Sequence, residues 1–267
     1  MKRIAALLGK ELADLRGNPA VFVPAVITGI ISILMPFVIA VAVPYFSGER
    51  LADSSDFRIA AEMFRTQPAT QGLDPEGAIQ AVIFQQFLIL LVLTPVAGAM
   101  SVAAYAVVGE KQARTLEPLL ATPITTFELL AAKVLGALVP GIILVIVCFT
   151  VYVGGAMAFA HPGVYRTLFF PRALLTMFLL GPLAALAALQ MAVCVSSRVN
   201  DARSAQQIGA LVILPISVLL VAQFTNNVDL TSRVILLISA ALAVLNLALM
   251  AVGVTLFDRE SILTRWK

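Results

Sequence analysis

GEKQARTLEPLLATPITTFELLAAKVLG, residues Gly109–Gly136, places a dense group of charges between two long apolar segments. It contains six of the chain's 33 charged residues, and the segments on either side carry none over 77–109 and 134–165. A soluble domain carries about 25% charged residues, whereas this chain carries 12% and is 60% hydrophobic. The stretch is therefore typical of a polar hinge that joins two membrane-spanning segments.

The rest of the chain repeats this apolar character. The charge-free runs cover 17–48, 77–109, 134–165, 173–197, 204–228 and 234–257. A helix of about 20 apolar residues crosses a bilayer, so each run predicts one transmembrane helix. The runs lack the alternation of a lipid-facing β-barrel, and the first is too long for a cleavable signal peptide. The sequence predicts an all-α integral membrane protein with six transmembrane helices.

The distribution of Lys and Arg predicts the orientation. If the N-terminus is cytoplasmic, 12 of the 18 Lys and Arg residues lie in cytoplasmic segments and 6 lie outside. Both termini and the hinge region 109–133 are then cytoplasmic, and 47–76 forms an external loop. We expect a multi-pass protein of the cell (inner, cytoplasmic) membrane. The net charge of +3 mostly reflects this bias and suggests no nucleic-acid partner.

The N-terminal segment 1–18 predicts an amphipathic helix in the membrane interface, ahead of a transmembrane domain over 19–267. Its apolar face consists of Ile4, Leu7, Leu8, Leu12 and Leu15. Lys10 lies on the polar side, whereas Glu11 falls near the middle of the apolar face. Two interpretations of Glu11 stay open: it reaches past the lipid edge to water, or it pairs with a cationic group of the same complex.

Uncharged polar residues within the runs are the candidates for a substrate path. The candidates are Gln85, Gln190, Ser217 and Asn246. The alternative is structural, because such side chains also form hydrogen bonds between membrane helices. The runs contain no charged residue, which disfavours an ion-coupled carrier.

The sequence offers no metal site or catalytic constellation. Cys148 and Cys194 lie inside apolar runs and are typical of small buried hydrophobes. His161 is the only histidine and is expected in a loop. We therefore expect a protein that is not an enzyme.

The hinge itself predicts two helices separated by a break. Glu110–Ala121 has helical composition, and Thr122-Pro123 ends it because a residue before proline avoids the helical conformation. Thr125 and Glu128 have the spacing of a capping box, so a second helix should begin at Thr126 and lead into the third span.

This hinge resembles the signature of permease subunits of type 2 ATP-binding cassette (ABC) exporters. The matching positions are Glu110, Thr115, Leu116, Glu117, Leu119, Leu120, Thr122, Pro123, Glu128 and Lys133. The opening GKEL…LRGNP also resembles the interfacial helix of that family. Gln112 and Arg114 depart from the pattern, which often has an acidic residue and a glycine there; this bears on partner docking rather than on the fold.

The resemblance implies that residues around 111–122 form a coupling helix, which docks in a cleft of a separate ATPase subunit. Glu117 would be the main contact, with Lys111 and Arg114 beside it. The chain contains no phosphate-binding motif, so it holds no cofactor itself, and ATP and magnesium would be bound by the partner. A second permease copy or a related permease chain would complete the assembly. The alternatives are a non-ABC membrane scaffold and an ATP-independent carrier.

Overall fold

The computed structural model describes residues 7–10, 13–14, 17, 22–53, 72–112, 125–196, 207, 211, 214–215, 217–218 and 230–256, with the backbone alone at 103–112 and 196. These residues include no strand. Five helical stretches are long and apolar enough to cross a membrane: Val23–Ser47, Pro75–Val102, Thr126–Phe159, Pro171–Val195 and Ser232–Leu256. They match five of the six predicted runs and confirm the all-helical membrane fold. The predicted span over 204–228 lies mostly outside the described residues.

The first span is helical throughout but not uniformly α-helical. It consists of α2 (Val23–Phe37), the π-helical segment η2 (Val38–Ala42) and α3 (Val43–Ser47). In η2, hydrogen bonds join residues five apart, as the bond from the N–H of Val43 to the carbonyl of Val38 shows. The segment follows Pro36, which has no N–H to donate to the preceding turn. Gly48 ends the span in the left-handed conformation, φ +73°, that glycine adopts without strain.

The other elements follow in chain order. They are η3 (Leu51–Asp53), α5 (Pro75–Gln112), α7 (Thr126–Phe159), α8 (Val164–Thr167), α9 (Pro171–Leu175), the π-helical η4 (Thr176–Leu180), α10 (Gly181–Ser196) and α13 (Ser232–Leu256). In the fourth span, α9, η4 and α10 follow one another without a break.

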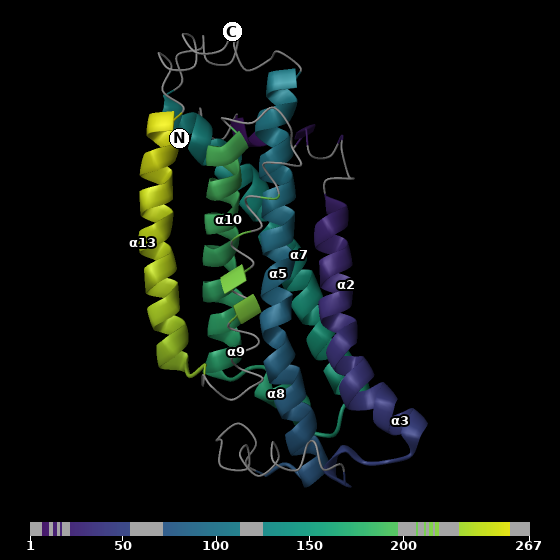
Figure 1. Cartoon of the computed structure of the whole chain (residues 1–267). Coiled ribbons are helices and arrows are strands. Elements are labelled where there is room, and N and C mark those ends of the chain that lie inside the picture. Colours follow the sequence, from purple (N-terminus) through teal and green to yellow (C-terminus); the bar gives the residue numbers. More distant parts are fainter. Residues whose placement is uncertain are drawn as a thin grey trace.

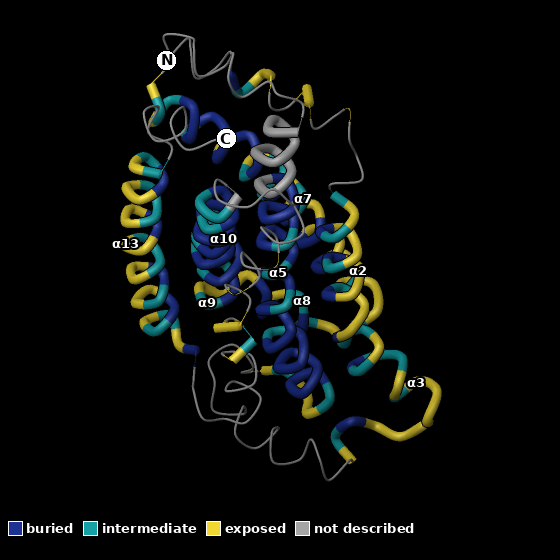
Figure 2. Tube along the Cα trace, turned by 45° about the horizontal axis from the view of Figure 1, so that its top comes forward, coloured by how far each residue is buried: buried dark blue, intermediate teal, exposed yellow. Residues whose placement is uncertain are grey.

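Helix α5 lies at the centre of the described bundle (Figure 1) and packs against α2, α7 and α10. In an 18-residue apolar stretch of the second span, 72% of the residues are buried. The corresponding share is 22% in the first span, α2 to α3, and 17% in α13. Figure 2 shows the same contrast, because α2 and α13 turn exposed faces outward. These faces carry large aliphatic side chains such as Ile27, Ile30 and Leu237. They suit contact with lipid.

The helix ends define two ends of the bundle. The start of α7, the end of α10 and the end of α13 meet, since a Cβ on Gly253 would lie 3.5 Å from Cδ1 of Leu130 and 3.6 Å from Sγ of Cys194. We call this the Thr126 end and the opposite one, where α5 begins, the Pro75 end (Figure 1). Helices α10 and α13 run in the same direction, so Ser196 and Ser232 lie at opposite ends.

Three aromatic rings hold α2, α5 and α7 together toward the Pro75 end. The ring of Phe37 packs edge-on against Phe84, with centroids 4.9 Å apart, and against Tyr152 at 5.9 Å. Tyr152 is fully buried, and its hydroxyl donates a 2.7 Å hydrogen bond to the carbonyl of Phe84. The bond gives the buried hydroxyl the partner that an apolar environment requires.

Small residues let the backbones approach at the crossings. A Cβ on Gly29 of α2 would meet Sγ of Cys148 at 3.0 Å, and one on Gly98 of α5 would meet Ala25 at 3.1 Å. Such close approach replaces the hydrophobic driving force that is missing between helices in lipid. Gly29 and Gly98 therefore serve close packing.

Candidate coupling site and polar positions in the bundle

The hinge is flanked by two long helices. Helix α5 runs without interruption from Pro75 to Gln112, so the backbones of Glu110 and Lys111 belong to the same helix as the second span. The sequence predicts a separate helix over Glu110–Ala121; its beginning is instead the end of α5. Composition cannot mark such a junction, because good helix formers occur on both sides of it. Other predicted coupling residues, Arg114, Thr115, Glu117, Thr122 and Pro123, lie outside the described residues.

The capping box at the start of α7 is confirmed. Oγ1 of Thr125 accepts a 3.2 Å hydrogen bond from the N–H of Glu128, and Oε2 of Glu128 accepts one of 2.9 Å from the N–H of Thr125. Thr125 is extended, with φ −74° and ψ 151°, and α7 begins at Thr126, as the sequence predicts. The reciprocal bonds satisfy two donors that a helix start leaves free. They fix where the third span leaves the hinge.

The Thr125→Ala variant is expected to loosen the first turn of α7 by about 1 kcal/mol, a typical cost of losing an N-cap side chain. The measurement is hydrogen–deuterium exchange of the amide of Glu128, which donates to Thr125. Thr150→Val is the control, because the hydroxyl of Thr150 bonds within α7, to the carbonyl of Ile146. Equal exchange in both variants and the wild type would show that the capping box does not stabilise this turn.

Lys133 is more deeply buried than the sequence predicts. The sequence places it in the polar hinge before the third span, whereas the structure buries it to 2% exposure within α7. The reason is tertiary: α7 already packs against α13 at Leu130, three residues earlier. A charged group therefore lies inside the described bundle at the Thr126 end.

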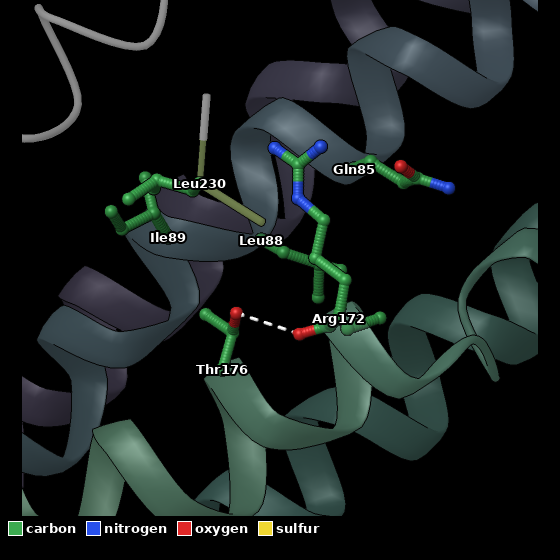
Figure 3. A pocket seen from close by; sticks show the side chains of 7 residues that line it. Gln85, Leu88, Ile89, Arg172, Thr176 and Leu230 are labelled. Atoms are coloured by element: carbon green, nitrogen blue, oxygen red, sulfur yellow. Dashed lines mark hydrogen bonds between the residues drawn. The ribbon is translucent and has the colours of Figure 1, made fainter. Parts of the chain in front are cut away.

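Gln85 lies in a small pocket between α5 and the fourth span (Figure 3). The side chain of Arg172 extends from α9 toward α5, and the floor is apolar, with Leu88 and Ile89 on α5. The amide nitrogen of Gln85 donates a 3.3 Å hydrogen bond to the carbonyl of Thr167. This bond supports the structural interpretation of Gln85. The volume of the pocket is about 10 Å³, which is room for roughly one water and not for a solute.

Gln190 and Asn246 lie elsewhere. Gln190 of α10 lines a second pocket of about 10 Å³ between α7, α10 and α13, which shares no lining residue with the pocket of Gln85. Asn246 of α13 donates a 3.0 Å hydrogen bond to the carbonyl of Leu183 on α10. Both side chains are buried. The two pockets do not bring Gln85 and Gln190 together, and their roles in a path stay predictions.

The remaining predicted positions are only partly described. Ser217 is helical and half-buried. Lys10 is exposed and lies 3.6 Å from Asp14, one turn along the N-terminal segment. Glu11 lies outside the described residues. His161 is in a loop, as predicted, and Cys148 and Cys194 form no disulfide.

Sequence reasoning missed Gln80, a buried glutamine in the second turn of α5. Its amide nitrogen donates to the carbonyl of Ala40 at 3.0 Å, and its Oε1 accepts from the N–H of His161 at 2.8 Å. These partners are 40 and 81 residues away. The only sequence signal for Gln80 is a glutamine among apolar residues near the start of a span. Gln85 and Gln86 share this signal, so it does not single out Gln80.

The chain matches a family model described as ABC-2 family transporter protein over residues 5–232. This range covers most of the 267 residues. The chain belongs to the ABC-2 transporter family. No curated protein matches it. This match confirms the family that the resemblance of the hinge predicts.

Membership in the ABC-2 family agrees with the apolar helices: the chain is a multi-pass membrane protein and a permease component of a transporter. Permeases of this family are generally non-catalytic, and the family implies association with ABC ATPase partners and the membrane. The matched range includes the hinge 109–133 and the first four described spans, and it ends where α13 begins.

Proposed function

We propose that this ABC-2 permease is the membrane subunit of an ATP-driven exporter and forms the substrate path. It is coupled to separate ATPase subunits through the hinge 109–133. The observation that carries the proposal is the helical frame of the hinge. Helix α5 leads into it without a break as far as Gln112, and α7 leaves it through the capping box at Thr125. A displacement of the hinge is therefore transmitted to two spans at once.

Within the hinge, Glu117 is the charge that meets the ATPase, and Lys111 and Arg114 flank it. The remaining coupling positions are Glu110, Thr115, Thr122, Pro123 and Glu128. ATP and magnesium belong to the partner, because this sequence has no glycine-rich phosphate loop of its own. Closure of the ATPases on ATP then tilts α5 and α7.

The proposed assembly contains two permeases and two ATPase subunits. The pockets beside Gln85 and Gln190 have room for about one water each, so neither is a conduit, whereas two permeases around a two-fold axis can enclose one. Closed two-fold pairing is the commonest solution among oligomers. The second permease is either another copy or a related chain.

The assembly experiment tests this function. The tagged chain is purified with its bound proteins in mild detergent, and the mass and MgATP hydrolysis of the complex are measured. We expect a four-subunit complex that hydrolyses ATP, and loss of hydrolysis when the ATPase is stripped away. A chain that purifies without any ATPase and still transports in liposomes would contradict the proposal.

The proposed orientation predicts which end of the bundle faces the cytoplasm. The Thr126 end and the N-terminus should be cytoplasmic and the Pro75 end external. In a background with Cys148→Ala and Cys194→Ala, Glu49→Cys should react with an impermeant thiol reagent on intact cells, and Gly9→Cys only after the cells are opened. Both positions are exposed, and a Cβ on Gly9 meets no atom within 4 Å. The reverse labelling pattern would overturn the orientation.

A further inference from the structure

Gln80 joins three segments of the chain at the Pro75 end. Its side chain is only 6% exposed, and both polar atoms of its amide are used. The nitrogen donates to the carbonyl of Ala40 in η2 of the first span, at 3.0 Å. The oxygen accepts from the N–H of His161 in the turn after α7, at 2.8 Å. One side chain of the second span thus ties the first span to the end of the third.

Two carboxylates reinforce the same junction. Oδ1 of Asp74 lies 3.3 Å from Nδ1 of His161 and accepts a 3.3 Å hydrogen bond from the N–H of Gly77. The carboxylate of Glu76 accepts hydrogen bonds of 3.2 and 3.0 Å from the N–H groups of Leu51 and Ala52. We call the side chains of Gln80, Asp74, Glu76 and His161 the Gln80 clasp.

The clasp separates water from the packed core. On one side is an open cavity of about 430 Å³, to which all four side chains of the clasp contribute. On the other side, one turn further along α5, Phe84 packs with Phe37 and Tyr152. Polar bonds beside water can be exchanged for bonds to water, whereas apolar contacts cannot. The clasp is therefore the part of this junction that can open and close reversibly.

The π-helical segment η2 gives the first span a place to move. A π segment departs from the regular hydrogen-bond ladder of a helix and often marks a functional position. Within a membrane protein, a buried carbonyl needs a partner from the protein, and Gln80 supplies a hydrogen bond to that of Ala40, which is fully buried. A rearrangement of the helix at η2 has to break or renew this bond.

We infer that Gln80 is a positioning residue that holds the Pro75 end of the bundle closed, and that its bonds to Ala40 and His161 break when this end opens during transport. The inference rests on the proposed function, which supplies the ATP-driven cycle. It adds the location of the closure and the residue that controls it.

The geometry allows the clasp to be locked by a disulfide. A Cβ on Gly77 would lie 3.4 Å from Cβ of His161, close to the separation of about 3.8 Å in disulfides. The same Cβ would lie 2.6 Å from Oδ1 of Asp74. This carboxylate is the end of a side chain that can rotate away, because His161→Cys removes its imidazole partner. The test protein is Gly77→Cys with His161→Cys, in the background with Cys148→Ala and Cys194→Ala.

The first measurement needs no ATPase. In the isolated permease in lipid nanodiscs, we expect mild oxidation to form the disulfide nearly completely. In a separate experiment, Gln80→Leu should raise the exchange rate of the His161 amide at least ten-fold. Gln80→Glu should keep that amide protected, because the carboxylate still accepts a hydrogen bond. Failure of the disulfide to form, or unchanged exchange in Gln80→Leu, would overturn the clasp whatever the chain transports.

The second measurement uses the complex with its ATPase and MgATP as the probe. Oxidation of the double variant should lower ATP hydrolysis at least ten-fold, and reduction should restore it; each single cysteine variant, oxidised in the same way, is the control. Hydrolysis that persists in the cross-linked complex would overturn the opening of the clasp and leave the proposed function intact. If the wild-type chain purifies without any ATP-hydrolysing partner, both the opening of the clasp and the proposed function would be overturned.

Discussion

Glu117→Lys is expected to abolish ATP-coupled activity while the protein still inserts in the membrane at its normal level. In the proposed complex, Glu117 meets the ATPase in a cleft, and reversing a charge there removes a pairing and adds like-charge repulsion. Such a change at an interface costs about 2–5 kcal/mol. We expect ATP hydrolysis by the complex to fall at least ten-fold, a fall that corresponds to about 1.4 kcal/mol or more. The measurement is MgATP hydrolysis by the purified complex in nanodiscs.

The control for Glu117→Lys is Asp53→Lys, which makes the same charge reversal at an exposed residue of the Pro75 end. This variant should hydrolyse ATP at the wild-type rate, because in the proposed complex the ATPase docks at the opposite end. If both variants behave like the wild type, Glu117 is not the coupling contact. If both lose activity equally, net charge rather than docking is the cause.

Gly155→Ala is expected to destabilise the fold, although alanine normally favours a helix over glycine. A Cβ on Gly155 would lie 2.6 Å from Cζ of Phe37 and 3.1 and 3.3 Å from two other carbons of the same ring. The ring has little room to retreat, because it packs edge-on against Phe84 and Tyr152. Overpacking of this kind costs about 1–3 kcal/mol. The measurement is the thermal unfolding midpoint of the purified chain, by circular dichroism in detergent.

The neighbouring glycine provides a matched control. A Cβ on Gly154 would meet no atom within 4 Å, so Gly154→Ala should leave the unfolding midpoint unchanged or raise it through the higher helix propensity of alanine. A double variant that replaces the ring by a smaller side chain, Phe37→Leu with Gly155→Ala, should recover part of the lost stability. Equal midpoints for Gly154→Ala and Gly155→Ala would show that the contact with Phe37 does not limit stability.

Local patterns predicted several element boundaries well. The second run begins at Gly77 and its helix at Pro75, and the capping box places the start of α7 at Thr126. The third run extends to residue 165, whereas α7 ends at Phe159. This end agrees with the prediction that His161 lies in a loop, because His161 precedes Pro162 and is therefore biased away from the helical conformation.

Contacts between distant residues could not be predicted in the same way. The apolar runs have similar composition, so nothing in them marked α5 as the central span and α13 as a peripheral one. The partners of Gln80 and Gln85 are also remote, and a polar residue in a span has the same appearance whether it bonds to a neighbour or faces a path. The burial of Lys133 likewise depends on where α7 meets the rest of the bundle.

The sequence by itself determined that the chain is a helical membrane protein, where its hinge lies and how α7 begins. These properties depend on the composition of continuous segments and on hydrogen bonds between residues three apart, as between Thr125 and Glu128. Only the tertiary structure decided that α5 occupies the centre and that Gln80 bonds to Ala40 and His161 at the Pro75 end. Both follow from packing between residues far apart in the chain, which in lipid depends on shape and hydrogen bonding rather than on hydrophobicity.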